Sequence, residues 1–153
     1  MGYTTDFDGQ FNLDRELSDD DYEFLVKFNE TRRMKRNVEG YGVDGEWFVD
    51  GTGFAGQDHD ATIVEYNGPP STQPGLWCQW RPTEDHKAIE WDDGEKFYNY
   101  VEWIEYLIDK ILAPRGYVLN GEVTWSGEDS NDHGIIVVVD NKVSTKTGRV
   151  VYE

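Results

Sequence analysis

The chain has a single cysteine, Cys78, and no long apolar run. A lone cysteine excludes a disulfide within the chain. A membrane-crossing helix needs roughly 20 consecutive apolar residues, and no segment comes near that length, so we expect no membrane contact. The N-terminal residues also lack the basic segment and apolar core of a secretory signal. Together these absences predict a cytoplasmic protein.

Basic residues are scarce as well. Lysine and arginine number 14 against 31 aspartate and glutamate residues, which gives a formal net charge of −17 over 153 residues. A negative field of this density attracts cationic surfaces and opposes direct contact with nucleic acid phosphates. The charge therefore favours a basic protein as the partner and argues against direct binding to nucleic acid.

Aromatic residues, in contrast, are abundant. Six tryptophans, nine tyrosines and seven phenylalanines make up 14% of the chain. Disordered acidic segments are poor in aromatic residues because they cannot bury enough apolar surface to offset the entropy of the chain. We therefore expect a single globular domain over residues 1–153, in which the Gly-rich segment 37–60 is the part most prone to be mobile or inserted.

Catalytic signatures are missing. The chain has no phosphate-binding glycine loop, no nucleophile elbow, no cysteine pair and no His-Glu-x-x-His zinc motif. The sequence therefore gives no reason to expect a cofactor, and it favours a binding protein over an enzyme.

Hydrophobic periodicity predicts the secondary structure. Period two over residues 3–13 indicates a strand, and Ser18 with Asp21 indicates the start of a helix over 19–34. Apolar residues at helical spacing predict a core helix over 95–113. Further strands are expected at residues 46–50, 63–66, 76–81, 87–91, 117–125, 135–139 and 141–152. Because few helices connect these strands, we predict an α+β fold, a mostly antiparallel sheet with two main helices packed on one face.

The most site-like stretch is the acidic loop 128–133. Asp129, Asn131 and His133 stand at positions 1, 3 and 5 of a calcium-loop template, and Asp132 adds a fourth polar side chain. The template then requires a glutamate at position 12, where this chain has Asp140, and a helix where a strand is predicted. A polar hairpin loop is therefore the favoured interpretation, and a metal site is the alternative.

Two further groups of ionisable residues have local explanations. Asp58, His59 and Asp60 could bind a metal, but in a Gly-rich segment exposed loop charge is favoured. Glu84 and Asp85 precede the strand at 87–91, and three more carboxylates follow it. Paired carboxylates can serve glycoside hydrolysis, although those that follow, Asp92, Asp93 and Glu95, suit the start of the predicted core helix.

Aromatic and basic clusters offer other surfaces. Trp77, Trp80, Trp91 and Tyr66 could form a platform for sugars or bases, but alternation along a strand places Trp77 and Trp80 on opposite faces, so core packing is favoured. A basic cluster also stands at the end of the first predicted helix, where cations are stabilising. Its residues are Arg32, Arg33, Lys35 and Arg36.

Four segments resemble those of short acidic proteins from bacteriophages and prophages. They are residues 30–36, 73–80, 94–103 and 116–125, and the resemblance spans most of the chain. The family is uncharacterised, so the resemblance implies a setting and no catalytic residue or fold. Small acidic phage proteins as a class include inhibitors of host defence, some of which imitate the charge of nucleic acid.

The sequence thus supports a non-enzymatic acidic protein that inhibits or decoys a basic host nucleic-acid-binding or defence protein. The contact candidates are surface carboxylates with no other evident role: Asp6, Asp8, Glu102, Glu105 and Asp109. One alternative is a metal-assisted hydrolase that uses the 128–133 loop. Another is a small-ligand or glycan-binding module built on an exposed tryptophan. The oligomeric state stays open.

Overall fold

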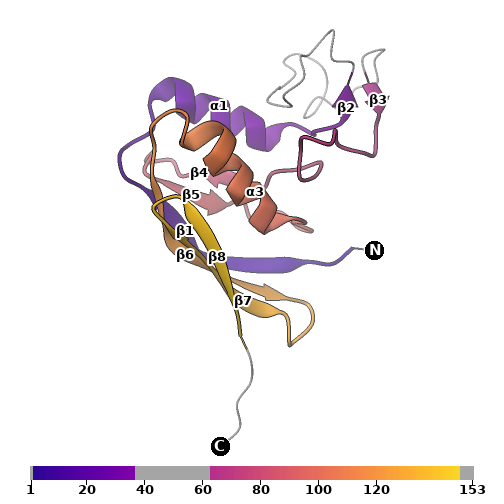
Figure 1. Ribbon diagram of the computed structural model, residues 1–153. Helices are drawn as coiled ribbons and strands as arrows, with labels where there is room; N and C mark the ends of the chain where they lie inside the picture. Colours follow the sequence, from indigo (N-terminus) through magenta and orange to yellow (C-terminus); the bar gives the residue numbers. More distant parts are fainter. Residues whose placement is uncertain (1, 37–62, 149–153) are drawn as a thin grey trace, which may run out of the picture.

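The computed structural model describes residues 2–36 and 63–148. Within these residues, a six-stranded antiparallel sheet has the order β4-β5-β1-β6-β7-β8, and β2 pairs with β3 in a small separate sheet. The elements are β1 (Thr5–Leu13), α1 (Asp19–Glu30), β2 (Lys35–Arg36), β3 (Ile63–Glu65), β4 (Trp80–Pro82), β5 (Ala88–Trp91), α3 (Tyr100–Tyr106), the π-helix η2 (Leu107–Leu112), β6 (Leu119–Gly127), β7 (His133–Val139) and β8 (Lys142–Thr147). The helices α1 and α3 lie on the same side of the sheet (Figure 1), so the predicted α+β fold is confirmed.

The centre of the sheet is formed by β1 and β6, which pair over nine residues from Thr5 opposite Gly127 to Leu13 opposite Leu119. Phe11 and Val123 are buried on the helical side of these strands. Even-numbered residues of β1 are exposed on the opposite side. The alternation of apolar and polar residues therefore predicted both the strand and which of its side chains face the core.

Helix α1 begins where the sequence indicated but ends earlier. The side chain of Ser18 accepts a hydrogen bond from the backbone N–H of Asp21, and the helix stops at Glu30, not at residue 34. Thr31 is already extended, and its hydroxyl group donates to the carbonyl of Lys27. The predicted boundary was wrong because the next residues make backbone hydrogen bonds elsewhere in the chain.

The basic cluster consequently does not lie at a helix C-terminus. The guanidinium of Arg33 is fully buried over the ring of Phe28, with the Cζ atom 3.9 Å from the ring centroid. Arg32 donates hydrogen bonds to the carbonyl of Tyr66, and Lys35 and Arg36 form β2. Stabilisation of a helix end is therefore not the role of this cluster.

The second helix also starts later than predicted. Lys96 and Asn99 have positive φ angles of 59° and 58°, so the helix begins at Tyr100 and not at residue 95. Phe97 is buried although it precedes the helix, and its contribution to the apolar pattern extended the prediction. The helix continues as η2, whose hydrogen bonding is wider than that of an α-helix.

The core lies between the sheet and the helices and is rich in aromatic rings. Phe7 packs edge-on against Trp80, Trp91, Phe97 and Tyr100, with ring centroids 4.9–5.7 Å apart. None of the described helices is long and apolar enough to cross a membrane.

The last hairpin joins β7 to β8. Asp140 and Asn141 both have positive φ angles, as the two-residue turns that join twisted antiparallel strands require. The strand β8 spans Lys142–Thr147, within the predicted strand 141–152. The Gly-rich segment 37–60, with its predicted strand 46–50 and the triplet Asp58, His59 and Asp60, lies outside the described residues.

Candidate acidic binding groove

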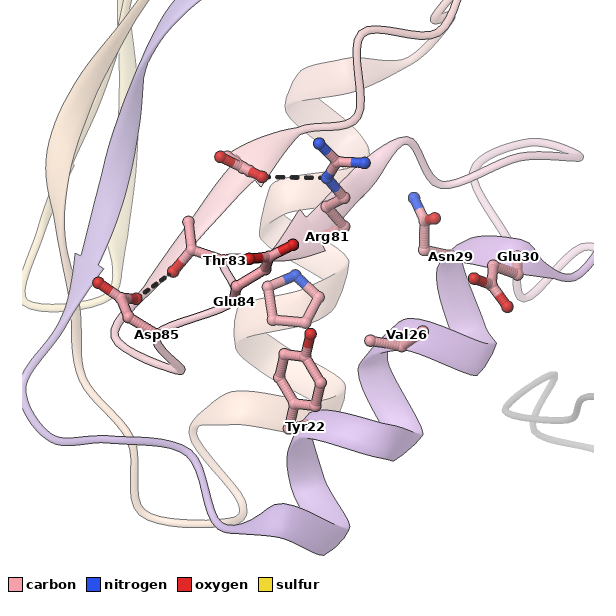
Figure 2. A pocket seen from close by; sticks show the side chains of 10 residues that line it. Tyr22, Val26, Asn29, Glu30, Arg81, Thr83, Glu84 and Asp85 are labelled. Atoms are coloured by element: carbon pink, nitrogen blue, oxygen red, sulfur yellow. Dashed lines mark hydrogen bonds and ion pairs between the residues drawn. The ribbon is translucent and has the colours of Figure 1, made fainter.

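A groove of about 570 Å³ runs between α1 and the edge strand β4. The helix is held along this edge by Asn29, whose side-chain amide donates to the carbonyls of Cys78 and Trp80 and to Oδ2 of Asp92. Figure 2 shows the side chains around the groove. The lining residues are Tyr22, Val26, Asn29 and Glu30 from α1, and Arg81, Pro82, Thr83, Glu84, Asp85 and Glu90 from β4, β5 and the turn between them.

The groove is strongly acidic. Among the described residues that line it, four carboxylates face a single cation, Arg81, whose Nε lies 3.0 Å from Oε2 of Glu90. Glu30 and Glu84 stand on opposite walls in Figure 2 and make no ion pair with any described residue. A positively charged group that enters the groove would therefore meet carboxylates without displacing an existing partner.

Asp85 is fixed by its own turn. The hydroxyl group of Thr83 donates to its carboxylate over 2.6 Å, and the backbone N–H of Lys87 donates over 2.9 Å. These two hydrogen bonds hold the pKa of Asp85 below its ordinary value, so this carboxylate stays ionised in the groove.

The groove also has apolar walls. Tyr22 stacks on the imidazole of His86 with ring centroids 4.0 Å apart. Figure 2 shows Tyr22 and Val26 on the α1 wall, and Pro82 lines the groove from β4. An aliphatic stem that ends in a positive charge, as in arginine or lysine, fits such a combination of surfaces.

Three of the predicted contact residues lie together elsewhere, on the outer side of the second helix. Glu102, Glu105 and Asp109 line a shallow hollow of about 400 Å³ with Lys110 and the segment 71–74. Each of the two surfaces has one cation in its described lining, and the hollow is the less acidic because it has three carboxylates where the groove has four.

The other two predicted contact residues lie on the opposite side of the molecule. Asp6 and Asp8 are exposed on the face of β1 that points away from the helices. The same face carries Lys142 and Lys146 on β8, because residues paired across antiparallel strands share a face. The five predicted residues therefore form two separate surfaces.

The 128–133 loop is a hairpin between β6 and β7 whose polar groups are used internally. Asp132 accepts hydrogen bonds from the hydroxyl group of Tyr3 and from Nε1 of Trp125. Asp129 accepts from the backbone N–H of Asn131, and Nδ1 of His133 lies 3.1 Å from the carbonyl oxygen of Ser130. No three His, Cys, Asp or Glu side chains in the described part of the chain gather as metal ligands would, so the predicted metal site gains no support.

The carboxylates after β5 also have structural roles. Asp92 accepts hydrogen bonds from Asn29 and from the backbone N–H of Gly94, and Asp93 has a left-handed backbone. Because the second helix begins at Tyr100, these residues do not stabilise its first turn as predicted.

Trp77 and Trp80 are separated, and Trp80 packs in the core as the favoured interpretation predicted. Trp80 is buried in the core, whereas Trp77 lies with Tyr98 in a separate cavity of about 580 Å³ that is walled by Pro69, Pro74 and Leu76. Tyr98 is 51% exposed. This cavity is the structural counterpart of the predicted ligand-binding alternative.

No known family model, curated protein or solved structure matches this chain. The resemblance to phage proteins therefore stays a prediction. Sequence reasoning noted Glu84 and Asp85 but missed Glu30 and Glu90 as members of one site. The available signal was the placement of Glu30 at the end of α1, although only the packing of α1 on β4 brings it to the groove.

Proposed function

We propose that this protein is a non-enzymatic binding protein that engages a basic protein through the acidic groove between α1 and β4. The observation that supports this proposal is that, in the described lining of the groove, four carboxylates surround apolar walls and the one cation, Arg81, is already paired with Glu90. An arginine or lysine of the partner places its stem against Tyr22 and its charge between Glu30 and Glu84.

The charge of the whole molecule assists this binding. A net charge of −17 accelerates encounter with a basic partner, whereas the groove supplies the local specificity. A partner that uses the same basic residues to hold nucleic acid would be blocked, which makes inhibition of a host nucleic-acid-binding or defence protein the corresponding activity. The resemblance to phage proteins agrees with that setting.

Variants matched in charge test the groove. We would measure the binding of a labelled peptide of alternating arginine and glycine to the wild type and to E30Q/E84Q, E102Q/E105Q and D6N/D8N. Each double variant removes two exposed negative charges. The groove variant is expected to bind about 5- to 30-fold more weakly, because each lost contact with a close cation is worth about 0.5–1 kcal/mol.

The other two variants are the controls. At physiological ionic strength, charges more than about 8 Å from the bound cation are largely screened, so both should bind within about twofold of the wild type. Equal losses in all three variants would show attraction to net charge alone and would contradict the groove. Pull-downs from a bacterial lysate with the wild type and E30Q/E84Q would then identify the partner.

A second candidate function is the binding of a small planar or glycan ligand in the cavity of Trp77 and Tyr98. The loop that forms one wall holds Lys96 in a left-handed conformation, which costs about 1–3 kcal/mol for such a residue and concentrates at ligand sites. Titration of a panel of sugars and nucleosides against tryptophan fluorescence tests it. Quenching that W77F abolishes would support this function, and no response to the panel would contradict it.

A further inference from the structure

The sheet face that points away from the helices is organised in three parallel zones. The strands β1 and β6 present Asp6, Asp8 and Glu122, β7 presents an apolar row, and β8 presents Lys142 and Lys146. The apolar row consists of Ile135, Val137 and Val139, of which Val139 is 56% exposed. No described residue covers these zones.

This face is nearly balanced in charge, unlike the rest of the chain. Three carboxylates and two lysines give it a formal charge of −1, whereas the whole chain carries −17. A basic partner would meet Lys142 and Lys146 here, so the face does not suit the partner proposed for the groove. Its zones suit a surface with acidic, apolar and basic zones in the reverse order.

A second copy of the chain presents such a surface. Asp8, Thr124, Ile135 and Lys146 form one row across the four strands, because Asp8 pairs with Thr124, Thr124 with Ile135 and Ile135 with Lys146. A two-fold axis can run parallel to the strands, between β6 and β7. It places each row of one copy over the same row of the second copy, with the four residues in reverse order. Asp8 then lies opposite Lys146 of the second copy.

Under this axis β6 of one copy lies over β7 of the other, so the apolar row of β7 packs on Thr124 and on the stem of Glu122. Ile135 of one copy lies over Thr124 of the other, where Thr124, Ile135 and Lys146 line a shallow hollow of about 330 Å³. Glu122 belongs to the row between those of Lys142 and Lys146 and lies within side-chain reach of both lysines of the second copy. Two sheets aligned in this way pack about 10 Å apart.

We propose that two copies of this protein form a two-fold dimer through the open face of β1, β6, β7 and β8, in which Asp8 of each copy pairs with Lys146 of the other. This inference does not depend on the proposed function of the groove. Four strands about 4.8 Å apart and roughly six residues long give a footprint near 400 Å² per copy, or roughly 800 Å² in total, which is below the range of about 1,200–2,000 Å² that stable interfaces bury. The dimer is therefore weak and forms at micromolar or higher concentrations.

Charge-reversal variants of the full chain distinguish this pairing from general electrostatics. We would measure sedimentation of the wild type, D8K, K146D and E105K at up to roughly 500 µM, which populates a dimer of micromolar affinity. D8K lowers the net negative charge of the chain. If only general repulsion between copies mattered, this change would strengthen association. If the pair of Asp8 with Lys146 holds the dimer, D8K weakens association by about tenfold or more. E105K makes the same charge change on the helical side and should retain the dimer.

A mixture provides the sharpest test. D8K and K146D are each expected to be monomeric, but an equimolar mixture should form a heterodimer. In that heterodimer the lysine introduced by D8K faces the aspartate introduced by K146D, and at the second contact the unchanged Asp8 faces the unchanged Lys146. The heterodimer has the same total charge as the wild-type dimer.

Two controls accompany the mixture. Melting curves of the single variants would verify that they fold, and V139D, which places a charge in the apolar row, should also be monomeric. A monomeric wild type, a D8K variant that dimerises like the wild type, or a mixture that stays monomeric would overturn the proposal.

Discussion

The hydroxyl group of Tyr117 donates a hydrogen bond of 2.7 Å to Oδ2 of Asp21, and Nη1 of Arg115 donates one of 2.8 Å to Oδ1 of the same carboxylate. The backbone N–H of Ser18 donates in turn to the Tyr117 hydroxyl oxygen. The guanidinium of Arg115 also lies over the ring of Phe24. These interactions connect the first turn of α1 to the segment that follows η2, and they depend on the ionised carboxylate of Asp21.

Replacement of Asp21 by asparagine should destabilise the protein in a pH-dependent way. Partial burial opposes ionisation of Asp21, but hydrogen bonds from Tyr117, Ser18 and Arg115 outweigh it and hold its pKa below its ordinary value. A lowered pKa contributes stability above the ordinary value that is lost as the pH falls through the folded-state value. We expect D21N to lose about 1–3 kcal/mol near pH 7 and progressively less below about pH 4.

Thermal unfolding of both proteins between about pH 3 and pH 7 measures this difference. Asp20 is exposed in the same helical turn, so D20N is the matched control and should follow the wild type at every pH. A constant difference between D21N and the wild type over the whole range would show that ionisation of Asp21 is not involved.

Gly121 is required where β6 passes β1. Its φ angle is 146°, and a Cβ atom there would lie 2.9 Å from the carbonyl oxygen of Gln10 and 3.1 Å from the Cα atom of Phe11. We expect G121A to lower the free energy of unfolding by about 1–3 kcal/mol, since both the backbone angle and the contact disfavour a side chain. Denaturant unfolding measures the loss, with S126A at an exposed position of the same strand as the control. Equal stability of the two variants would contradict this account.

The sheet could be predicted from the sequence because its signals are local. Alternation along β1 and β6 depends on each strand alone, and the Ser18 cap acts within one helical turn. The helix ends could not be predicted in the same way. Asn99 is a residue type that tolerates the left-handed conformation it adopts, but nothing marks Lys96, which adopts the same conformation in the loop that leads to α3.

The groove was less predictable than the sheet. Glu30 and Glu90 are 60 positions apart in the sequence. They line the same groove because α1 packs along the edge of β4, where the side chain of Asn29 donates hydrogen bonds to backbone carbonyls. The burial of Arg33 over Phe28 likewise accompanies a backbone hydrogen bond to Leu76. Sequence patterns identify which residues are charged or apolar, whereas long-range packing decides which of them share a site.

Cys78 should be inert in the folded protein. The residue is fully buried, and burial raises the pKa of its thiol to about 12, although Sγ lies 3.7 Å from the carbonyl oxygen of Trp80. Thiolate is the reactive form, so a thiol reagent near pH 8 should modify the native protein only as fast as it unfolds. One equivalent should react at once in denaturant. Rapid native modification would mean that β4 opens readily from α1.

The side chain of Asp132 distinguishes a structural loop from a metal site. It accepts hydrogen bonds of 2.7 Å from Tyr3 and 3.0 Å from Trp125, and these tie the N-terminal residues to the β6–β7 hairpin. We expect D132A to lower the free energy of unfolding by about 1–3 kcal/mol, because the indole N–H of Trp125 loses its charged acceptor. Y3F removes one of the two hydrogen bonds and should lose less.

Melting temperatures with and without divalent cations complete this test. Any ligand that binds only the folded state raises the melting temperature with its concentration. Both oxygens of Asp132 already accept hydrogen bonds. We therefore expect Ca²⁺, Mg²⁺ and Zn²⁺ to leave the difference in melting temperature between the wild type and D132A unchanged. A cation that stabilises the wild type and not D132A would instead establish the 128–133 loop as a metal site and would favour the hydrolase alternative.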